Sequence, residues 1–491
     1  MENKSIWSRA SKTKKKRKLT RNISVDVLII GGGMTGLNTA FNLRNYKGKV
    51  ALVEQREIGK GVSSRTTGKI NYLQETIYQT IEKTYSFDIA KKYLQSQRMA
   101  TRRLKSIIYK YKIKCDFDKT KSYVFTNDKT EKKKLIYEKE LLEKMGIKVT
   151  SHSKIDNNFK CIYAISVNDT YVFNCVKYMN TMKDIISSSI NIYENTRVQQ
   201  IKKSNESYVC KTDNYEIRAK KVILACHYPF FLKPYFMPLK VSNEKSICIA
   251  ARVNKYKKIN YITSALPTKS IRYHKDKKNY LIYVSNSHLI CDDTNDKKNI
   301  KKVLQDAKKI NLKVDYLWTN DDLITVDRLP YIGPIEKDNN TLLIGTGYNT
   351  WGMANSVLAA SILSDLVQGK QNEFAEIFNP LRVNICSDIN EYLANIGHST
   401  KSLISNKVVK NKLWYSDSVL FENRNGKNIA TYQDEKGNKH TVLSTCPHMG
   451  CTLLFNEAEK TWDCPCHASR FNIDGKCIKG PSAYDISYKE E

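Results

Sequence analysis

Apolar and polar positions divide the first part of the chain into strands and helices. Residues 25–30 form a largely β-branched apolar run, typical of a strand buried in a parallel sheet. A glycine-rich turn follows, and residues 50–53 form a second such run. Residues 88–111 carry apolar side chains at helical spacing, among them Leu94 and Leu104. The order strand, turn, helix, strand predicts an α/β domain at the start of the chain.

The rest of the chain continues the α/β pattern and ends differently. Short strands are predicted at 190–193, 198–202, 208–211 and 222–225. Residues 246–319 are predicted to contain further strands and one helix near 300–310. A strand is predicted at 341–347 and a helix at 351–368. Residues 379–412 are predicted to be a linker with one helix. Residues 414–491 alternate short apolar runs with turn residues. We therefore expect a large α/β part followed by a small all-β domain.

Composition and charge narrow the class of protein. With 41% hydrophobic and 27% charged residues among 491, the chain has the composition of a soluble globular protein. No apolar run reaches the roughly 18 residues of a membrane helix, and no signal peptide is evident. The net charge of +33 comes mostly from evenly spread lysine, with one concentration at Lys12–Lys18. We interpret residues 1–22 as a basic leader, and the Lys12–Lys18 concentration within it most simply as a solvated, flexible tail. The alternative is weak contact with an anionic membrane surface. No nucleic-acid-binding motif is present, so no nucleic-acid partner is expected.

The thirteen cysteines indicate a reducing compartment. Eight are scattered singly in mostly apolar contexts, as free buried thiols are. The other five fall in the last 46 residues. A cytoplasmic location is expected, with peripheral contact at the inner membrane face as the variant that the leader suggests.

The first chemical motif is a dinucleotide-binding turn. Gly31, Gly33 and Gly36 form G-x-G-x-x-G between the first strand and a helix that begins near Thr35. The glycines allow a tight turn, close approach of a pyrophosphate and close helix packing. The phosphates would lie at the helix N-terminus. Glu54 ends the second strand, where an acid binds the ribose hydroxyls of an unphosphorylated adenosine. These residues alone leave FAD and NAD open.

Later segments favour FAD by resemblance. The segments 61–69, 325–333 and 343–353 resemble the D-amino-acid oxidase/glycine oxidase superfamily of FAD enzymes. The resemblance implies that the first holds phosphate and flavin and that the other two lie beside the isoalloxazine ring. It also places the Val198 backbone on the adenine. Motif and resemblance together imply flavin contacts from Gly31, Gly33, Met34, Thr35, Gly36, Glu54, Gln55, Ser64, Arg65, Thr66, Thr67, Val198, Gly347, Trp351, Gly352 and Met353.

The second chemical motif lies near the C-terminus. Cys446 and His448 are followed, after fifteen residues, by Cys464 and His467, in the pattern C-x-H-x15-C-x-x-H. Two knuckles that each supply one Cys and one His suit a two-iron cluster with both histidines on one iron. Zinc is the competing metal. Its knuckles usually keep the cysteines in one and the histidines in the other.

The surroundings of this motif resemble the Rieske [2Fe-2S] family. Pro481 matches the family's proline loop, and Ser469 matches the serine that bonds to cluster sulfur. Cys451 and Cys466 occupy mirror positions in the two loops, where they can form a disulfide. Ala468 stands where glycine is usual. Phe471 replaces the tyrosine of high-potential respiratory members, which predicts a lower reduction potential, because a donor to sulfur stabilises the reduced cluster.

Both halves together resemble a bacterial group that fuses the two domains. The Ser5–Trp7 segment and residues 379–382 also match that group, whereas Asn174-Cys175 stands where we expect His-Pro. The resemblance implies an α/β FAD-binding Rossmann-like domain interleaved with an α+β substrate domain, then an all-β Rieske domain. The expected bounds are 1–22 for the leader, 23–378 for the oxidoreductase domain, 379–412 for the linker and 413–491 for the Rieske domain. Within the oxidoreductase domain, the FAD-binding parts are expected at about 23–71, 190–228 and 323–370, and the substrate-domain parts at about 72–189 and 229–322.

The fusion predicts electron transfer between a small substrate at the flavin and the cluster, then to an unknown one-electron carrier. Two alternatives stay open: an oxidase that uses O2 with a structural or sensory cluster, and a non-catalytic membrane-associated electron carrier. A Rieske oxygenase is disfavoured because the six remaining histidines include no closely spaced pair for a mononuclear iron. The substrate, the catalytic residues and the oligomeric state are not assigned. Arg252, Arg272, Tyr283 and Arg328 are candidate substrate binders, although structural roles are the simpler interpretation.

Overall fold

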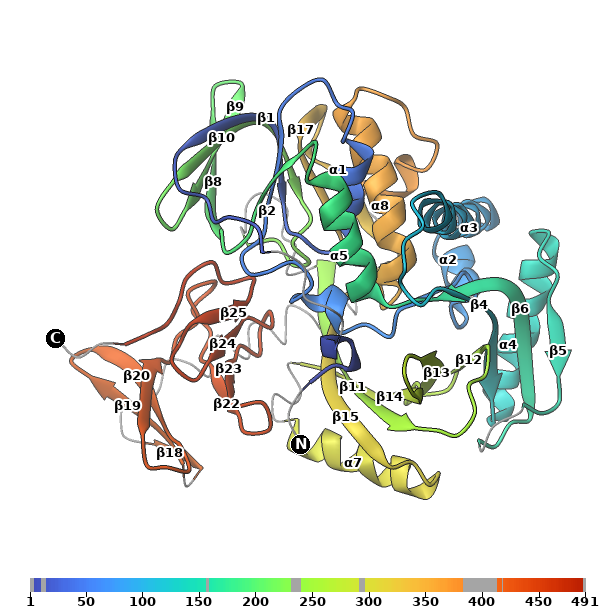
Figure 1. The fold of residues 1–491 in the computed structure, drawn as a ribbon. Helices are drawn as coiled ribbons and strands as arrows, with labels where there is room; N and C mark the ends of the chain where they lie inside the picture. Colours follow the sequence, from blue (N-terminus) through green and yellow to red (C-terminus); the bar gives the residue numbers. More distant parts are fainter. Residues whose placement is uncertain are drawn as a thin grey trace.

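The computed structural model describes residues 4–9, 15–155, 159–230, 240–290, 296–382, 413–416 and 418–488. These residues form two large sheets with their helices and a smaller C-terminal domain beside them (Figure 1). The predicted α/β fold followed by an all-β domain is confirmed. Predicted elements agree with the observed ones to within a few residues. The helix expected in the linker lies outside the described residues.

The first sheet is built around strand β1 (Ile23–Ile30). It pairs in parallel with β2 (Val50–Val53) on one side and β10 (Glu216–Leu224) on the other. The last four residues of β1 are all buried, which explains the continuous apolar run. The other strands of this sheet are β7 (Asn191–Tyr193), β8 (Val198–Ser204), β9 (Ser207–Thr212), β16 (Tyr331–Glu336) and β17 (Asn339–Thr346).

Three helices pack together along this sheet: α1 (Met34–Asn42), α5 (Cys175–Ile186) and α8 (Gly352–Val367). Asn174 caps α5 by accepting hydrogen bonds from the amides of Val176 and Lys177. Cys175 is fully buried. The two residues that stand in place of the expected His-Pro therefore begin a helix, and neither lines either of the cavities described below.

The second sheet runs in the order β15-β11-β14-β13-β12-β4-β6-β3, with β5 beside β6. Its strands are β3 (Lys69–Ile70), β4 (Asp118–Thr126), β5 (Thr150–His152), β6 (Tyr163–Val172), β11 (Val241–Arg252), β12 (Ile259–Thr263), β13 (Ser270–Lys275), β14 (Asn279–Leu289) and β15 (Val314–Thr325). The helices α2 (Ile77–Thr84), α3 (Phe87–Lys110), α4 (Lys129–Lys144) and α7 (Lys297–Lys309) accompany it. Because its strands come from both sides of β10 in sequence, the chain crosses repeatedly between the two sheets.

The C-terminal domain consists of two four-stranded antiparallel sheets. One contains β18 (Leu413–Ser416), β19 (Val419–Arg424), β20 (Lys427–Gln433) and β21 (Lys439–Leu443), and the other β22 (Leu454–Asn456), β23 (Thr461–Asp463), β24 (Arg470–Asn472) and β25 (Cys477–Lys479). Phe455, Trp462 and Phe471 are fully buried in its core. The two Cys/His loops precede β22 and β24.

Part of the basic leader is buried. Ile6 and Trp7, in the 3-10 helix Ile6–Arg9, are buried in the main core, and Leu19 is buried against the first sheet. Of the Lys12–Lys18 run, Lys15, Arg17 and Lys18 are exposed, so its prediction as solvated is confirmed for them. The Lys16 amide donates to Glu194 at 2.7 Å, so the run is anchored at this point and is not a flexible tail there. Lys12 and Lys14 lie outside the described residues. Among the residues that the structure describes, no helix has the length and apolar character needed to cross a bilayer.

Candidate functional site

The glycine turn after β1 is tightly packed. Gly31 has a φ of +113°, and a Cβ there would lie 2.4 Å from the Ala225 carbonyl oxygen. A Cβ on Gly36 would lie 1.9 Å from the Gly31 carbonyl oxygen. Only glycine fits either position, so α1 can begin directly beneath the turn.

Glu54 lies at the end of β2 beside this turn. Its Oε2 accepts a hydrogen bond from the Gly32 amide at 2.8 Å, and its Oε1 accepts one from the Arg56 amide at 3.0 Å. Each oxygen retains a lone pair, so the carboxylate can still accept from ribose hydroxyls. The turn and the acid therefore fit the adenosine end of a dinucleotide.

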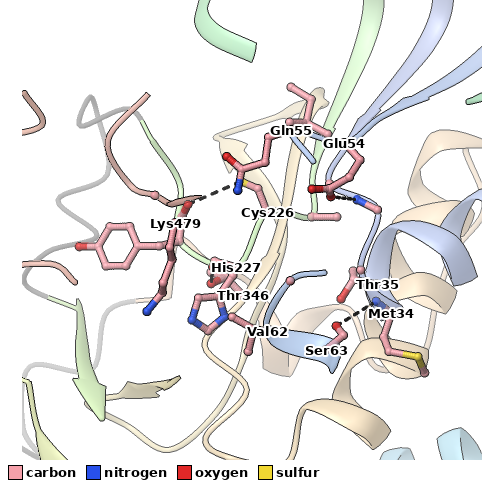
Figure 2. A pocket seen from close by; sticks show the side chains of 18 of the residues that line it. Met34, Thr35, Glu54, Gln55, Val62, Ser63, Cys226, His227, Thr346 and Lys479 are labelled. Carbon is pink, nitrogen blue, oxygen red and sulfur yellow. Dashed lines mark hydrogen bonds between the residues drawn. The ribbon is translucent and has the colours of Figure 1, made fainter. Parts of the chain in front are cut away.

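A long cavity runs from this turn across the first sheet (Figure 2). The predicted flavin residues that line it are Gly31, Gly33, Met34, Thr35, Glu54, Gln55, Thr66, Val198, Gly347, Gly352 and Met353. Those that do not line it are Gly36, Ser64, Arg65, Thr67 and Trp351. The lining thus joins, in one cavity, residues expected at the adenosine, such as Glu54 and Val198, and residues expected at the isoalloxazine ring, such as Gly347 and Met353.

Ser63 faces this cavity, and sequence reasoning missed it. Its Oγ accepts a hydrogen bond from the Met34 amide at 3.2 Å. The neighbouring Ser64, chosen from the sequence, donates instead to the Gly61 carbonyl at 2.6 Å. Adjacent serines carry no signal that tells which one faces a ligand.

The loop at residues 64–68 is held from outside the cavity. The Trp7 indole donates to the Thr66 carbonyl at 2.6 Å, and the Ser5 hydroxyl donates to the Ser64 carbonyl at 3.0 Å. Arg272 donates to the Gly68 carbonyl at 3.0 Å, and burial lowers its pKa to about 10. Arg272 is therefore a structural clamp on this loop.

A second cavity of about 470 Å³ adjoins the first and shares Thr66, Asn320, Asp322, Thr350 and Met353 with it. Lys69, Glu75, Glu244, Arg328 and Trp351 also line it. Among the described residues, the side chains of Glu75, Glu244 and Arg328 form no hydrogen bond or ion pair. Charged groups that are held in a cavity without partners are the expected lining of a site for a polar small molecule.

Burial shifts the ionisation of these groups. It raises the pKa of Glu75 to about 7, with Glu244 adding to the rise, and raises that of Asp322 to about 7. It lowers the pKa of Lys69 to about 8. The cavity thus holds groups that change protonation near neutral pH, as sites of proton transfer and charge recognition do.

Of the four substrate binders considered from the sequence, only Arg328 lines the second cavity. Arg252 is exposed and pairs with Asp315 at 2.6 Å. Tyr283 is buried and stacks on Phe159. The residues of this cavity that sequence reasoning missed, such as Glu75 and Glu244, belong to no recognisable motif.

In the C-terminal domain, Cys446 and Cys464 lie side by side and are buried. A hydrogen bond between the two thiols lowers the pKa of Cys446 to about 7 and raises that of Cys464. The nearby Ser469 hydroxyl and the amides of His448 and Met449 also lower the pKa of Cys446. The loop thus presents donors that stabilise a thiolate, the form that binds metal.

His448 and His467 complete the set. Their rings lie 5.0 Å apart, and none of their four ring nitrogens has a hydrogen-bond partner among the described residues. Burial lowers the pKa of His448 to about 4 and that of His467 to about 3, so both imidazoles are neutral and able to bind metal. Two adjacent thiols and two unpartnered imidazoles fit a two-iron cluster.

The two loops are joined by a disulfide between Cys451 and Cys466, with their Cα atoms 6.6 Å apart. The Cys464 sulfur lies within 4.8 Å of both disulfide sulfurs. Phe471 is fully buried beneath the loops. Ala468 has a φ of +61°, which explains why glycine is usual there. Ser469 also accepts from the Ser482 amide at 2.9 Å, which ties the proline loop to the second ligand loop.

The cluster site and the first cavity share a wall. Residues Lys479, Gly480, Ser482 and Ala483 around Pro481 line the flavin cavity. Figure 2 shows Lys479 opposite Met34 and Thr35. From the other domain, Tyr228 lines the cavity and contacts the rings of both His448 and His467. These contacts join distant segments, so no sequence signal could have found them.

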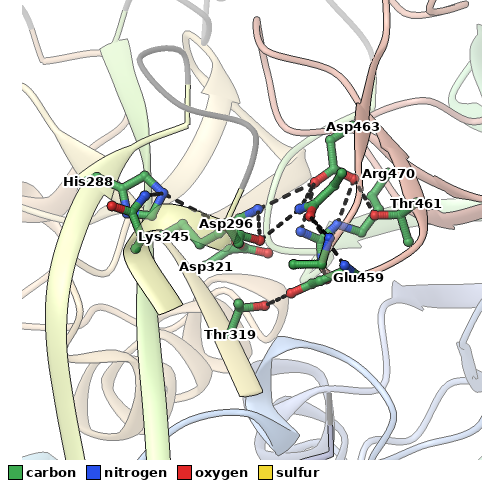
Figure 3. Close-up of polar contacts among 12 residues, drawn as sticks. Lys245, His288, Asp296, Thr319, Asp321, Glu459, Thr461, Asp463 and Arg470 are labelled. Carbon is green, nitrogen blue, oxygen red and sulfur yellow. Dashed lines mark hydrogen bonds and ion pairs between the residues drawn. The ribbon is translucent and has the colours of Figure 1, made fainter. Parts of the chain in front are cut away.

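A buried network of charges holds the two domains together (Figure 3). Lys245 of β11 lies 3.1 Å from Asp296 and 3.4 Å from Asp463 of the C-terminal domain. Arg470 bonds to Asp463 at 3.0 Å and also to Glu459. Burial alone would raise the pKa of Asp463, but Arg470 and Lys245 hold it below its usual value.

A second buried pair, Lys479 with Asp321 at 2.7 Å, lies between this network and the cavity. Against the effect of burial, Lys479 and Arg470 hold the pKa of Asp321 well below its usual range. Charges buried on both sides of an interface are compensated only while the domains stay in contact. The network therefore favours one fixed arrangement of cluster site and cavity.

Comparison with known proteins agrees with both sites. Residues 26–366 match the FAD dependent oxidoreductase family, and residues 406–488 match the Rieske [2Fe-2S] domain. The chain is 28% identical over 473 residues to YhfW of Bacillus subtilis (strain 168), whose name describes a Rieske 2Fe-2S iron-sulfur protein; the match covers 94% of this chain and 93% of YhfW. It is 24% identical over 382 residues to gamma-glutamylputrescine oxidoreductase of Escherichia coli (strain K12), covering 74% and 88%.

Solved structures show the same fold over the first three quarters of the chain. Glycine oxidase from Geobacillus kaustophilus aligns with a TM-score of 0.62 at 19% identity, covering 73% of this chain and 99% of the oxidase. L-proline dehydrogenase from P. horikoshii aligns with a TM-score of 0.61 at 16% identity, covering 75% and 98%.

Proposed function

Because the chain belongs to the FAD dependent oxidoreductase family and contains a Rieske [2Fe-2S] domain, we propose that it passes electrons between a small organic substrate and an external one-electron carrier by way of its own cluster. One observation carries the proposal: the loop Lys479–Ala483 of the Rieske domain lines the same cavity as the glycine turn. Two redox sites that share a wall are placed to exchange electrons within one molecule.

Each site has residues suited to its group. The first cavity would hold FAD through the turn at Gly31, Glu54 and the Ser63 loop, and Cys446, His448, Cys464 and His467 would hold the cluster. When bound, FAD supplies two-electron oxidation and reduction, and the cluster supplies one-electron transfer. The ion pairs around Lys245 and Asp321 link the two domains and so favour a fixed contact between the sites.

The substrate that we propose is an amine, an amino acid or a similar small polar molecule, bound in the second cavity. That cavity adjoins the expected flavin site and offers Glu75 and Glu244 to a positive group, and Lys69 and Arg328 to a negative one. The name of the E. coli relative, gamma-glutamylputrescine oxidoreductase, describes an amine of this type.

The test is a panel of amines, amino acids and hydroxy acids, mixed without oxygen with the chain loaded with FAD and cluster. We expect one substrate to bleach the flavin and to support reduction of a one-electron acceptor. The matched control is Cys446→Ser, which should still bleach but lose acceptor reduction. If Cys446→Ser keeps full turnover with O2 as acceptor, the protein is an oxidase and the electron-transfer proposal is wrong.

A further inference from the structure

Tyr228 is the residue of the flavin-binding domain that touches the cluster site. It follows β10 by four residues and lines the flavin cavity. Its ring centroid lies 6.1 Å from that of His448 at 86° and 5.9 Å from that of His467 at 59°. These are ordinary distances for packed aromatic rings. One side chain of the first domain therefore packs against both imidazole ligands of the other.

The hydroxyl of Tyr228 has no partner within the described chain. The side chain is 4% exposed, and its oxygen forms no hydrogen bond among the described residues. A buried hydroxyl without a partner has lost the hydrogen bonds that it makes to water, so native proteins rarely keep one. The missing partner is then a group that the site receives, and the two such groups here are the cluster and the flavin.

The surroundings of Tyr228 favour the cluster. Its ring packs against the imidazoles of both His448 and His467. A cluster held by these two ligands would therefore lie directly beside Tyr228.

The Rieske domain itself has no tyrosine at position 471. Phe471 stands there, fully buried, and has no hydroxyl to offer to cluster sulfur. Hydrogen bonds to cluster sulfur raise the reduction potential because they stabilise the extra negative charge of the reduced state.

We propose that the Tyr228 hydroxyl donates a hydrogen bond to sulfur of the bound cluster, so that the flavin-binding domain sets the cluster's reduction potential. The tyrosine that the Rieske domain lacks at position 471 is thus supplied from outside it. The buried charge network around Lys245 keeps the donor in place. The inference needs the cluster but no electron flow from the flavin, so it can fail independently of the proposed function.

The test is an EPR-monitored redox titration of the full chain with both groups bound and no substrate. Tyr228→Phe keeps the ring and removes the hydroxyl, so we expect the cluster potential to fall while the flavin potential stays unchanged. Tyr432→Phe is the matched control. Tyr432 is a buried tyrosine of the Rieske domain that stacks on Phe455, and its described ring contacts include neither ligand. The cluster potential of Tyr432→Phe should therefore equal that of the wild type.

A second measurement identifies the proton itself. Pulsed EPR in H2O and D2O should show one exchangeable proton coupled to the reduced cluster in the wild type that is missing in Tyr228→Phe. Phe471→Tyr should raise the cluster potential both in the wild type and in Tyr228→Phe. An unchanged cluster potential in Tyr228→Phe, or a shift of the flavin potential alone, would overturn the inference, and the latter would assign the hydroxyl to the flavin.

Discussion

One residue of the cluster-ligand loops has a backbone conformation that its side chain disfavours. Ala468 adopts a φ of +61° between the ligand His467 and the donor Ser469. A left-handed conformation costs a residue with a Cβ roughly 1–2 kcal/mol, and glycine avoids that cost. The alanine noticed in the sequence as unusual is thus a strained position in the folded loop.

Ala468→Gly should therefore stabilise the holoprotein. Glycine removes the strain of the folded loop but makes the unfolded chain more flexible, which costs roughly 0.4–1 kcal/mol. The strain is larger than this cost, so the free energy of unfolding should rise by about 0.5–1 kcal/mol. The free energy of unfolding is measured by denaturant titration, with cluster absorbance as the signal. The reverse change Gly450→Ala, at a φ of +80° in open space in the first ligand loop, should lose stability. Equal effects of the two variants would contradict the argument.

Glu75 provides a pH prediction. Its pKa of about 7 means that it is neutral below pH 7 and negative above. For an amine substrate that stays cationic, KM should fall roughly tenfold between pH 6 and pH 8, as the charged fraction of Glu75 rises. Lys69, with a pKa lowered to about 8 by burial, is about half deprotonated at pH 8.

Glu75→Gln should reduce this pH dependence of KM and leave only the part that Asp322, with a pKa also raised to about 7 by burial, contributes. Glu138→Gln is the control, because Glu138 is another buried carboxyl with a pKa raised to about 7 by burial, outside both cavities. A Glu75→Gln variant with the wild-type profile would remove Glu75 from substrate binding.

At the scale of elements, a short N-terminal segment holds the flavin loop. Trp7 is 1% exposed and stacks edge-on against His274, while its indole donates to Thr66. The sequence placed this segment in a basic leader and matched it to the fusion group, but it did not predict the contact, because nothing local marks a tryptophan that packs some sixty positions away. The glycine turn was predictable, since its strand, turn, helix and acid are contiguous.

Trp7→Phe should weaken FAD binding by up to about tenfold, because a hydrogen bond that orders the loop contributes about 0.5–1.5 kcal/mol. Titration of FAD into the apoprotein, followed by flavin fluorescence, gives the Kd. Trp462→Phe makes the same chemical change in the Rieske domain, where the indole donates to Ile473, and should leave the Kd unchanged. A Kd unaffected by Trp7→Phe would show that the loop orders without this bond.

At the scale of the whole molecule, the contact between domains is what the sequence could least reveal. The four cluster ligands could be read from two short motifs because each motif supplies its own pair. The network that joins Lys245 to Asp463, and the contact of Tyr228 with His448, link residues more than two hundred positions apart. Such pairs follow from tertiary packing and leave no spacing pattern.

Lys245→Met should loosen the Rieske domain. Lys245 is 1% exposed, and its removal leaves the carboxylates of Asp296 and Asp463 facing each other in a buried interface, a loss of about 3–5 kcal/mol. Unfolding followed by cluster absorbance measures it. Lys297→Met is the control, since Lys297 pairs with Glu457 at the exposed rim and its loss should not be measurable. Equal stability of the two variants would show that the buried network does not hold the domains together.

The central claim is that one molecule carries electrons between its flavin site and its cluster. The direct measurement is freeze-quench EPR of the fully loaded chain, mixed without oxygen with a flavin-bleaching substrate and no external acceptor. We predict that the reduced-cluster signal grows as the flavin bleaches, at a rate independent of protein concentration. A bleached flavin beside a cluster that stays oxidised, or a rate that scales with protein concentration, would contradict the account.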